Sequence, residues 1–172
     1  VKVEGGQWGE KEKPSKAFLE KVSLDKWDAL LRFLLRIEGS SLVTPGGTID
    51  NFVCRTGLMQ NRGAHKKYDS TKRTRANVMN LQITAKGYEY MLKSYQQQVW
   101  VFVYETIQHI EGRDELLSLL FMLSYCEFGE GYPMVALTPA QKALVLEFSA
   151  VGLVYVEDQA PSEEGGVFFP SY

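Results

Sequence analysis

One local pattern occurs twice in this chain: a helix followed by Gly-Leu, a strand, a polar loop and a return strand. It constrains the fold more than any other feature. The first copy contains FVCRTGLM before its loop and VMNLQI after it, and the second contains FSAVGLVYV and VFF. Glycine readily adopts the left-handed conformation that ends a helix, and short β-branched and aromatic runs around a loop are typical of a hairpin. Helices followed by a two-stranded hairpin are typical of a winged helix. We therefore predict a mainly α chain of the α+β class, with two winged-helix domains in tandem.

The helices expected before the hairpins cover residues 23–39, 48–56, 114–126 and 138–151. Ser23 is suited to cap the first of them, and Thr138-Pro139-Ala140-Gln141 is a capping-box pattern at the start of the last. Residues 114–126 are apolar nearly all round, which predicts a largely buried helix. Because only one clear helix lies between 23–39 and the first hairpin, the first domain is expected to be abbreviated.

An aromatic block over residues 81–108 joins the two copies. Periodicity does not distinguish a buried strand from a buried helix in its apolar run 99–104. No Gly or Pro interrupts the surrounding sequence, which is too long for a typical strand. We predict a helix over residues 96–110, with aromatic side chains such as Trp100 in the core.

Shorter elements complete the expected plan. Thr84 is expected to cap a short helix whose Tyr88, Met91 and Leu92 share one face. Residues 134–136 are expected to be extended. The predicted division is a linker or the tail of a preceding domain at 1–22, a first domain at 23–94 with a long basic wing, and a second domain at 95–172.

Charge is distributed unevenly. Residues 1–104 carry 17 Lys and Arg against 10 Asp and Glu, and residues 105–172 carry 2 against 11, so the net charges are +7 and −9. A nucleic-acid partner is therefore conceivable for the first half and disfavoured for the second. No apolar run reaches the length of a membrane span, which predicts no membrane role. The first residue is Val rather than Met, so we expect an excised piece of a longer protein.

Signals of catalysis are absent from the sequence. The Gly-Gly pairs lack the strand–helix context of a phosphate loop, and His65 and His109 have no Cys, Asp or Glu at ligand spacing. Cys54 and Cys126 are far apart without a Cys-x-x-Cys, so buried free thiols in a reducing compartment are the simplest account. We predict that the chain is not an enzyme and uses no cofactor or metal.

The basic loop between the first pair of strands is the one candidate recognition feature. Its candidate nucleic-acid contacts are Arg62, Lys66, Lys67, Lys72, Arg73 and Arg75, against the single acidic Asp69. As a wing it would lie along a phosphate backbone; as a solvated insertion it would bind nothing.

The helices that would enter a DNA groove are poor base readers. Residues 48–56 offer only Asp50, Asn51 and Arg55, and residues 138–151 offer only Gln141, Lys142 and Glu147. Base-reading helices project several Arg, Lys, Asn or Gln side chains. By analogy with winged helices whose recognition faces are weak, a protein-binding module is favoured.

Four stretches, in order, resemble a known family. They are SLDKWDALLRFLL, LQITAKGYEYMLKSYQQQVWVFVYETIQ, ELLSLLFMLSYCEFGEGYPM, and LEFSAVGLVYV followed by VFFPSY. Together they resemble the fifty-two-kilodalton subunit of TFIIH, the general transcription and DNA-repair factor, over about Ser23 to the end of the chain. Three departures are Pro-Ser-Tyr at 170–172, where the family often has Pro-Thr-Arg, the acidic pair Glu163 and Glu164, where a basic stretch is common, and a basic loop at 62–75 that is longer than the family's usual one.

The resemblance implies a non-enzymatic scaffold in the nucleus. Its family anchors the XPB translocase in the TFIIH core and stimulates its ATPase in transcription initiation and nucleotide excision repair. The family's XPB-docking region lies beyond the end of this chain. The resemblance therefore implies protein–protein contacts for this fragment, with the von Willebrand A-like subunit as the expected partner. The alternative is a winged-helix DNA-binding module that uses the basic loop 62–75.

Overall fold

The computed structural model describes residues 13–35, 47–62, 80–109, 112–157 and 166–171. Within them the chain is mainly helical, with six α-helices and two small antiparallel sheets. It divides into two compact units: unit 1 contains Val1–Trp27 and Glu111–Tyr172, and unit 2 contains Asp28–Ile110. The first helix, α1 (Lys16–Leu35), contributes to both units. The predicted boundary between residues 94 and 95 stays a prediction.

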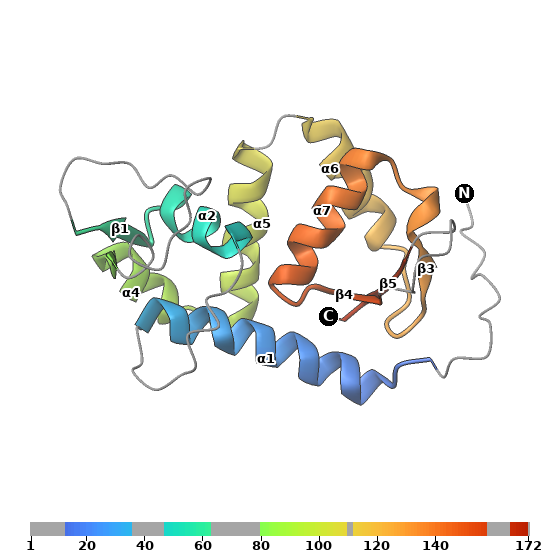
Figure 1. Cartoon of the computed structure of the whole chain (residues 1–172), viewed down its shortest axis with the longest axis horizontal. Helices are drawn as coiled ribbons and strands as arrows, with labels where there is room; N and C mark the ends of the chain where they lie inside the picture. The colour runs from blue at the N-terminus through green and yellow to red at the C-terminus, as the bar shows by residue number, and fades with distance from the viewer. Residues whose placement is uncertain (1–12, 36–46, 63–79, 110–111, 158–165, 172) are drawn as a thin grey trace. The chain divides into compact units, whose positions relative to one another are not determined.

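Unit 2 contains α2 (Gly47–Arg55), β1 (Met59–Asn61), β2 (Leu81–Ile83), α4 (Ala85–Met91) and α5 (Tyr95–His109) (Figure 1). The strands pair antiparallel, with Met59 opposite Ile83. The predicted first hairpin is thereby confirmed, and Gly57 ends α2 with a φ of 71°. The predicted helix over the aromatic block is confirmed as well.

Three aromatic rings form the centre of unit 2. Phe52 of α2 packs edge-on against Phe102 of α5 at 4.9 Å between ring centroids, and against Tyr90 of α4 at 6.2 Å. All three side chains are buried. The Tyr90 hydroxyl donates to the carbonyl of Gln98, and the Gln98 side-chain amide donates back to the carbonyls of Tyr90 and Lys93. Because this buried amide serves carbonyls at the end of α4, it fixes the junction between α4 and α5.

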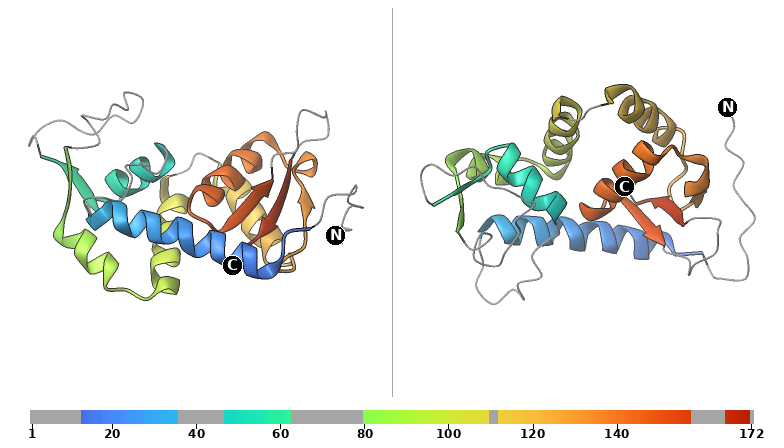
Figure 2. Two further views of the ribbon diagram at one scale, coloured as in Figure 1. Left: turned by 60° about the horizontal axis from the view of Figure 1, so that its bottom comes forward. Right: turned by 45° about the horizontal axis from the view of Figure 1, so that its top comes forward.

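Unit 1 contains α6 (Arg113–Leu123), β3 (Tyr132–Pro133), the 3₁₀ helix η2 (Met134–Ala136), α7 (Pro139–Ala150), β4 (Val154–Glu157) and β5 (Val167–Pro170). Its antiparallel sheet has the order β3-β5-β4, with β5 in the middle (Figure 2). α7 contacts both α6 and β4. The predicted capping box is confirmed, since Thr138 accepts from the Gln141 amide and the Gln141 side chain accepts from the Thr138 amide.

The first part of α1 packs on the turn that follows α7. Gly152 has a φ of +83°, and a Cβ atom placed there would lie 2.8 Å from the backbone oxygen of Ser23. Next to this contact, the Lys26 ammonium donates to the carbonyl and hydroxyl oxygens of Ser149. Burial lowers the pKa of Lys26. Only glycine therefore fits where α1 crosses the turn.

Two local predictions about unit 1 are wrong. Ser23 does not cap α1 but is buried inside it, because the helix begins earlier and the Phe18 amide is bonded to the Ser15 hydroxyl. Residues 134–136 form a 3₁₀ turn rather than an extended piece. The short edge strand β3 was not foreseen; it includes Pro133, which an edge position tolerates.

Two predictions of burial are also wrong. The Trp100 side chain of α5 is 70% exposed, because the face of that helix toward the core carries Gln98, Phe102 and Thr106 instead. The face that Tyr88 and Leu92 share on α4, for which the sequence predicted no burial, is exposed, whereas Gly87 and Tyr90 are buried. The helix α6 is only partly buried, as described below.

Candidate interaction surfaces

The basic loop lies almost entirely outside the described residues. Of its six predicted contacts only Arg62 is described; it is exposed at the base of the loop, where its backbone amide donates to the carbonyl of Asn80 at 2.9 Å. The other five, Lys66, Lys67, Lys72, Arg73 and Arg75, lie outside the described part of the chain. Their role in DNA contact stays a prediction.

The polar residues of α2 offer little for reading bases. Asp50 is buried at 0% exposure, whereas Asn51 and Arg55 are exposed. The Arg55 side chain lies in the last turn of the helix. This face therefore has two exposed polar groups rather than the several that base-reading helices project.

The solvent side of α7 is apolar. Gln141 is buried in the capping box, and Lys142 and Glu147 are half-buried. The exposed residues between Pro139 and Leu146 are Pro139, Ala140, Ala143 and Leu146. Such a face offers few of the hydrogen bonds that distinguish base pairs.

Three large apolar side chains of unit 1 project from α6 and the residues just after it. Leu117 is 51% exposed, Phe121 67% and Tyr125 73%. Their four-residue spacing places them along one side of the helix. The Phe121 and Tyr125 rings pack edge-on at 5.1 Å between centroids. We call these three residues the α6 stripe.

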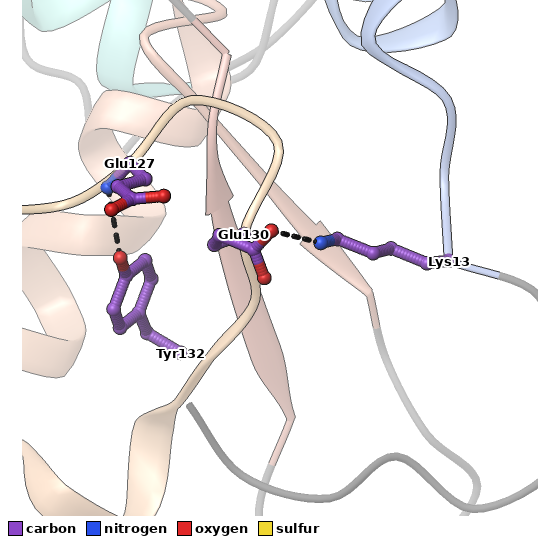
Figure 3. Close-up of polar contacts among 4 residues, drawn as sticks. All are labelled: Lys13, Glu127, Glu130 and Tyr132. Carbon is purple, nitrogen blue, oxygen red and sulfur yellow. Dashed lines mark hydrogen bonds and ion pairs between the residues drawn. The ribbon is translucent and has the colours of Figure 1, made fainter. Parts of the chain in front are cut away.

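The loop after α6 is held in place by polar contacts. The Tyr132 hydroxyl accepts a hydrogen bond from the Glu127 amide at 2.8 Å, and Lys13 forms an ion pair with Glu130 (Figure 3). Burial raises the pKa of Tyr132, so its phenol stays neutral. These contacts therefore fix the backbone that follows Tyr125, the last residue of the α6 stripe.

Unit 2 has exposed aromatic residues of its own. Trp100 and Tyr104 lie one turn apart on α5 and are 70% and 58% exposed. Tyr88 in the middle of α4 and Leu92 at its C-cap are exposed as well. Exposed Gln96, Gln97 and Gln108 accompany them on α5. The sequence prediction had assigned these aromatics to the core.

The described part of the chain shows no metal centre, and the thiol of Cys126 is not activated. No group of three or more His, Cys, Asp or Glu side chains there is placed to hold a metal ion. Neither cysteine forms a disulfide, and both are half-buried. Burial raises the pKa of Cys126, whose thiol donates to the Met122 carbonyl, so it is a poor nucleophile. No described helix is long and apolar enough to cross a membrane.

The sequence did contain a signal for the α6 stripe. A helix that is apolar nearly all round has more apolar surface than one packing face can cover. Leu116 and Leu119 supply that packing face and are fully buried. The remaining large residues at positions 117, 121 and 125 were therefore candidates for a second contact surface.

These features define a class of protein: a mainly helical α+β module whose helices α5 and α6 expose large apolar side chains. The family model "Transcription factor Tfb2" matches residues 4–171, nearly the whole chain. The chain therefore belongs to the Tfb2 family, which comprises non-catalytic subunits of TFIIH, a nuclear complex that acts in transcription and DNA repair. The resemblance identified from the four stretches is thereby confirmed.

Individual relatives agree at low identity. The chain is 23% identical over 145 residues to "General transcription and DNA repair factor IIH subunit TFB2" of Kluyveromyces lactis, covering 82% of this chain and 26% of the relative. It is 25% identical over 166 residues to "General transcription factor IIH subunit 4" of Dictyostelium discoideum, covering 92% of this chain and 30% of the relative. The TFB2 subunit of Yarrowia lipolytica is 26% identical over 85% of this chain. The chain thus spans less than a third of the length of these relatives.

Proposed function

We propose that this chain is a scaffold segment of the TFIIH core that binds other subunits through helix surfaces. The sequence resembles the family whose subunit anchors the XPB translocase and stimulates its ATPase. We assign this segment to contacts with the von Willebrand A-like subunit. The segment that docks XPB itself would lie further along the full protein.

One observation carries the proposal. The helices that would have to read bases expose few polar groups. On α7, none of the three polar side chains predicted to contact bases, Gln141, Lys142 and Glu147, is fully exposed. In the same unit, Leu117, Phe121 and Tyr125 are each more than half exposed. Large apolar groups at a surface favour a protein partner, because burying them removes apolar area from water.

We further propose that unit 1 is a winged-helix domain. It has the helix α6, the edge strand β3, the helix α7 and the β4–β5 hairpin, and β5 pairs with both other strands. The shorter unit 2 has the helix α2 followed by the β1–β2 hairpin, and corresponds to an abbreviated copy. Tandem winged helices would supply the rigid helix faces that a scaffold needs.

Co-expression with the core TFIIH subunits tests the scaffold function. We expect the tagged full-length subunit to retain the von Willebrand A-like subunit through washes at about 0.5 M salt, because at this salt the screening length falls to a few ångströms and mainly apolar contacts persist. Deleting residues 13–171 from the full-length subunit should abolish that retention. Retention that is unchanged by the deletion would contradict the proposal.

A DNA-binding role is the second candidate, carried by the charge of the loop at residues 62–75. Changing Lys66, Lys67, Lys72, Arg73 and Arg75 to Glu tests it. If the loop binds the phosphate backbone, duplex binding should fall steeply with salt and be lost in this variant. Under the scaffold proposal, the variant should still retain its partner subunit.

A further inference from the structure

We propose that one face of the β1–β2 hairpin in unit 2 reads base pairs in the major groove of duplex DNA. The face consists of four polar side chains that we call the hairpin face: Gln60, Arg62, Asn80 and Gln82. The inference goes beyond the scaffold function and does not depend on it. It assigns base reading to a surface that is separate from the helices considered above.

The four side chains lie on one face of a paired ribbon. Gln60 is opposite Gln82 in the antiparallel register. Two residues further along, the Arg62 amide donates to the Asn80 carbonyl at 2.9 Å. Because successive side chains of a strand point to opposite faces, residues 60 and 62 share a face, and residues 80 and 82 share the same one. The register therefore brings both pairs together in one polar patch.

The other face of the hairpin is the one that packs in unit 2. Met59 and Leu81 are buried there, and Ile83 packs against α4, since a Cβ atom added at Gly87 would meet the Ile83 side chain. On the hairpin face three residues are exposed, and the fourth, Gln82, is half-buried. Within the described part of the chain, none of these four side chains forms a hydrogen bond or an ion pair. Their donors and acceptors are therefore available to a ligand.

The chemistry of the hairpin face matches the edges of base pairs. Arg donates two parallel hydrogen bonds to guanine, and Asn and Gln each bind adenine with one donor and one acceptor. All four residues of the hairpin face belong to these three types, and none is acidic. The described carboxylates of unit 2 lie on helices instead, at Asp28, Asp50, Glu89 and Glu105.

The net charge of unit 2 favours the same partner. Residues 28–110 carry 11 Lys and Arg against 6 Asp and Glu, a net charge of +5. The whole chain has a net charge of −2, so unit 1 carries −7. A positive unit attracts the phosphates that border a groove, whereas a negative one repels them. Unit 2 is therefore the unit suited to DNA.

The shape of the ribbon selects the groove and the kind of duplex. The major groove of B-DNA is about 12 Å wide and admits a two-stranded β-ribbon. Double-stranded RNA is disfavoured, because its major groove is too deep and narrow for side chains to read. An apolar protein surface is disfavoured as well, because it would bury four polar side chains without hydrogen bonds.

Selection from a pool of short duplexes with a randomised centre tests the proposal with the full-length subunit. We expect one sequence to be enriched. The enriched duplex should bind at least about 10-fold more tightly than a scrambled duplex of the same composition, because a bidentate contact to a base discriminates by about that factor or more. Double-stranded RNA of the enriched sequence should bind no more tightly than the scrambled DNA.

Variants of the hairpin face identify the reader. Gln60→Ala/Gln82→Ala should lower the preference for the enriched duplex by about 10-fold and leave the salt dependence of binding unchanged, because these amides contact bases rather than phosphates. The matched control is Gln96→Ala/Gln108→Ala, two exposed glutamines of α5 in the same unit, which should keep the preference. Arg62→Lys retains the charge but loses the planar fork, so it should weaken binding to the enriched duplex more than to the scrambled one.

The outcomes separate this inference from the scaffold function. The inference is overturned if the wild-type subunit binds no duplex, binds every sequence equally, or binds RNA as tightly as DNA. It is also overturned if the α5 control loses the preference as much as the hairpin variant does.

Retention of the von Willebrand A-like subunit, measured in parallel, tests the scaffold function by itself. If Gln60→Ala/Gln82→Ala lost that retention, the hairpin face would be a protein interface and the inference would fail. Because Gln60 is exposed and neither side chain is bonded within the described residues, this variant should unfold at the wild-type denaturant midpoint. The midpoint thereby distinguishes lost base reading from lost folding.

Discussion

The two hairpins of this protein are closed by the same pair of hydrogen bonds. In unit 2, the Thr84 amide donates to the Leu58 carbonyl at 3.0 Å and its hydroxyl donates to the Gly57 carbonyl at 2.7 Å. In unit 1, the Ser171 amide donates to the Leu153 carbonyl at 3.3 Å and its hydroxyl donates to the Gly152 carbonyl at 2.7 Å. The Ser or Thr after the second strand thus binds back to the Gly-Leu step before the first.

The two hairpins differ in the helix that packs against these closing hydrogen bonds. Thr84 also begins α4, because its hydroxyl accepts from the Gly87 amide. Gly87 lies so close to the first hairpin that an added Cβ would overlap the Leu58 carbonyl oxygen. In unit 1 the cover is α1, which meets the turn at Gly152. A Cβ atom at Gly57 would meet nothing within 4 Å. The repeated Gly-Leu pattern therefore fixes the turn. The glycine that cannot be replaced differs between the units, because a different helix packs against each hairpin.

The largest expected effect comes from alanine at the covered glycines. Gly87→Ala and Gly152→Ala should each lower the free energy of unfolding by about 3 kcal/mol or more, because the new methyl group meets backbone oxygen. Gly57→Ala should cost only about 1 kcal/mol, for its positive φ alone. Urea unfolding followed by circular dichroism measures all three. Equal costs at Gly57 and Gly152 would show that α1 does not press on the turn.

Removing the closing hydroxyls should have a smaller effect. Thr84→Ala should cost about 2 kcal/mol, since it removes both the hairpin bond and the helix cap of α4. Ser171→Ala should cost about 1 kcal/mol, since it removes only the bond to the Gly152 carbonyl. Amide hydrogen exchange of each hairpin checks where the loss occurs. Equal costs would mean that the cap adds nothing to α4.

Local chemistry explains which parts of the fold were predictable. Gly57, Gly152, Thr84 and the capping box at Thr138 were identified from sequence because the helix stop or helix cap that each provides is formed within a few residues of it. Trp100 and Phe121 were misplaced because a helix with apolar residues on several sides does not show which side faces its own core. The identity of the covering helix depends on contacts such as Ser23 with Gly152, 129 positions apart, and no local pattern records it.

Two buried tyrosines extend the comparison to alkaline pH. Burial raises the pKa of Tyr90 well above its ordinary value of 10.0, so its neutral form stabilises the folded state. That stability is fully present below pH 10.0, and as the pH rises the unfolded state begins to lose its proton first. Unit 2 should therefore lose about 1 kcal/mol of stability by pH 11.

Tyr90→Phe separates titration from packing. The variant should be less stable at neutral pH, because it lacks the hydrogen bond to Gln98, but its stability should fall less between pH 9 and pH 11. Tyr132→Phe is the counterpart in unit 1. Its pH profile should change less, because the Glu127 amide donates to the Tyr132 oxygen and opposes the rise of its pKa. Parallel profiles of wild type and Tyr90→Phe would contradict this account.

The smallest contrast concerns two lysines that donate to backbone carbonyls near the ends of equivalent helices. Lys86 is exposed and donates to the Thr56 carbonyl just after α2 at 2.8 Å, whereas Lys26 is half-buried and donates to the Ser149 carbonyl at the end of α7. Lys86→Met should cost about 0.5 kcal/mol, because it removes a cation from a helix C-terminus without relieving any burial. Lys26→Met should change the free energy of unfolding little at pH 7. Burial disfavours the charged ammonium and lowers its pKa, so removing the charge offsets the cost of the lost hydrogen bond.

Urea unfolding of the two variants, with Lys21→Met as an exposed control on α1, measures both effects. A loss above about 2 kcal/mol for Lys26→Met would mean that the bond to Ser149, rather than the packing at Gly152, holds α1 on unit 1.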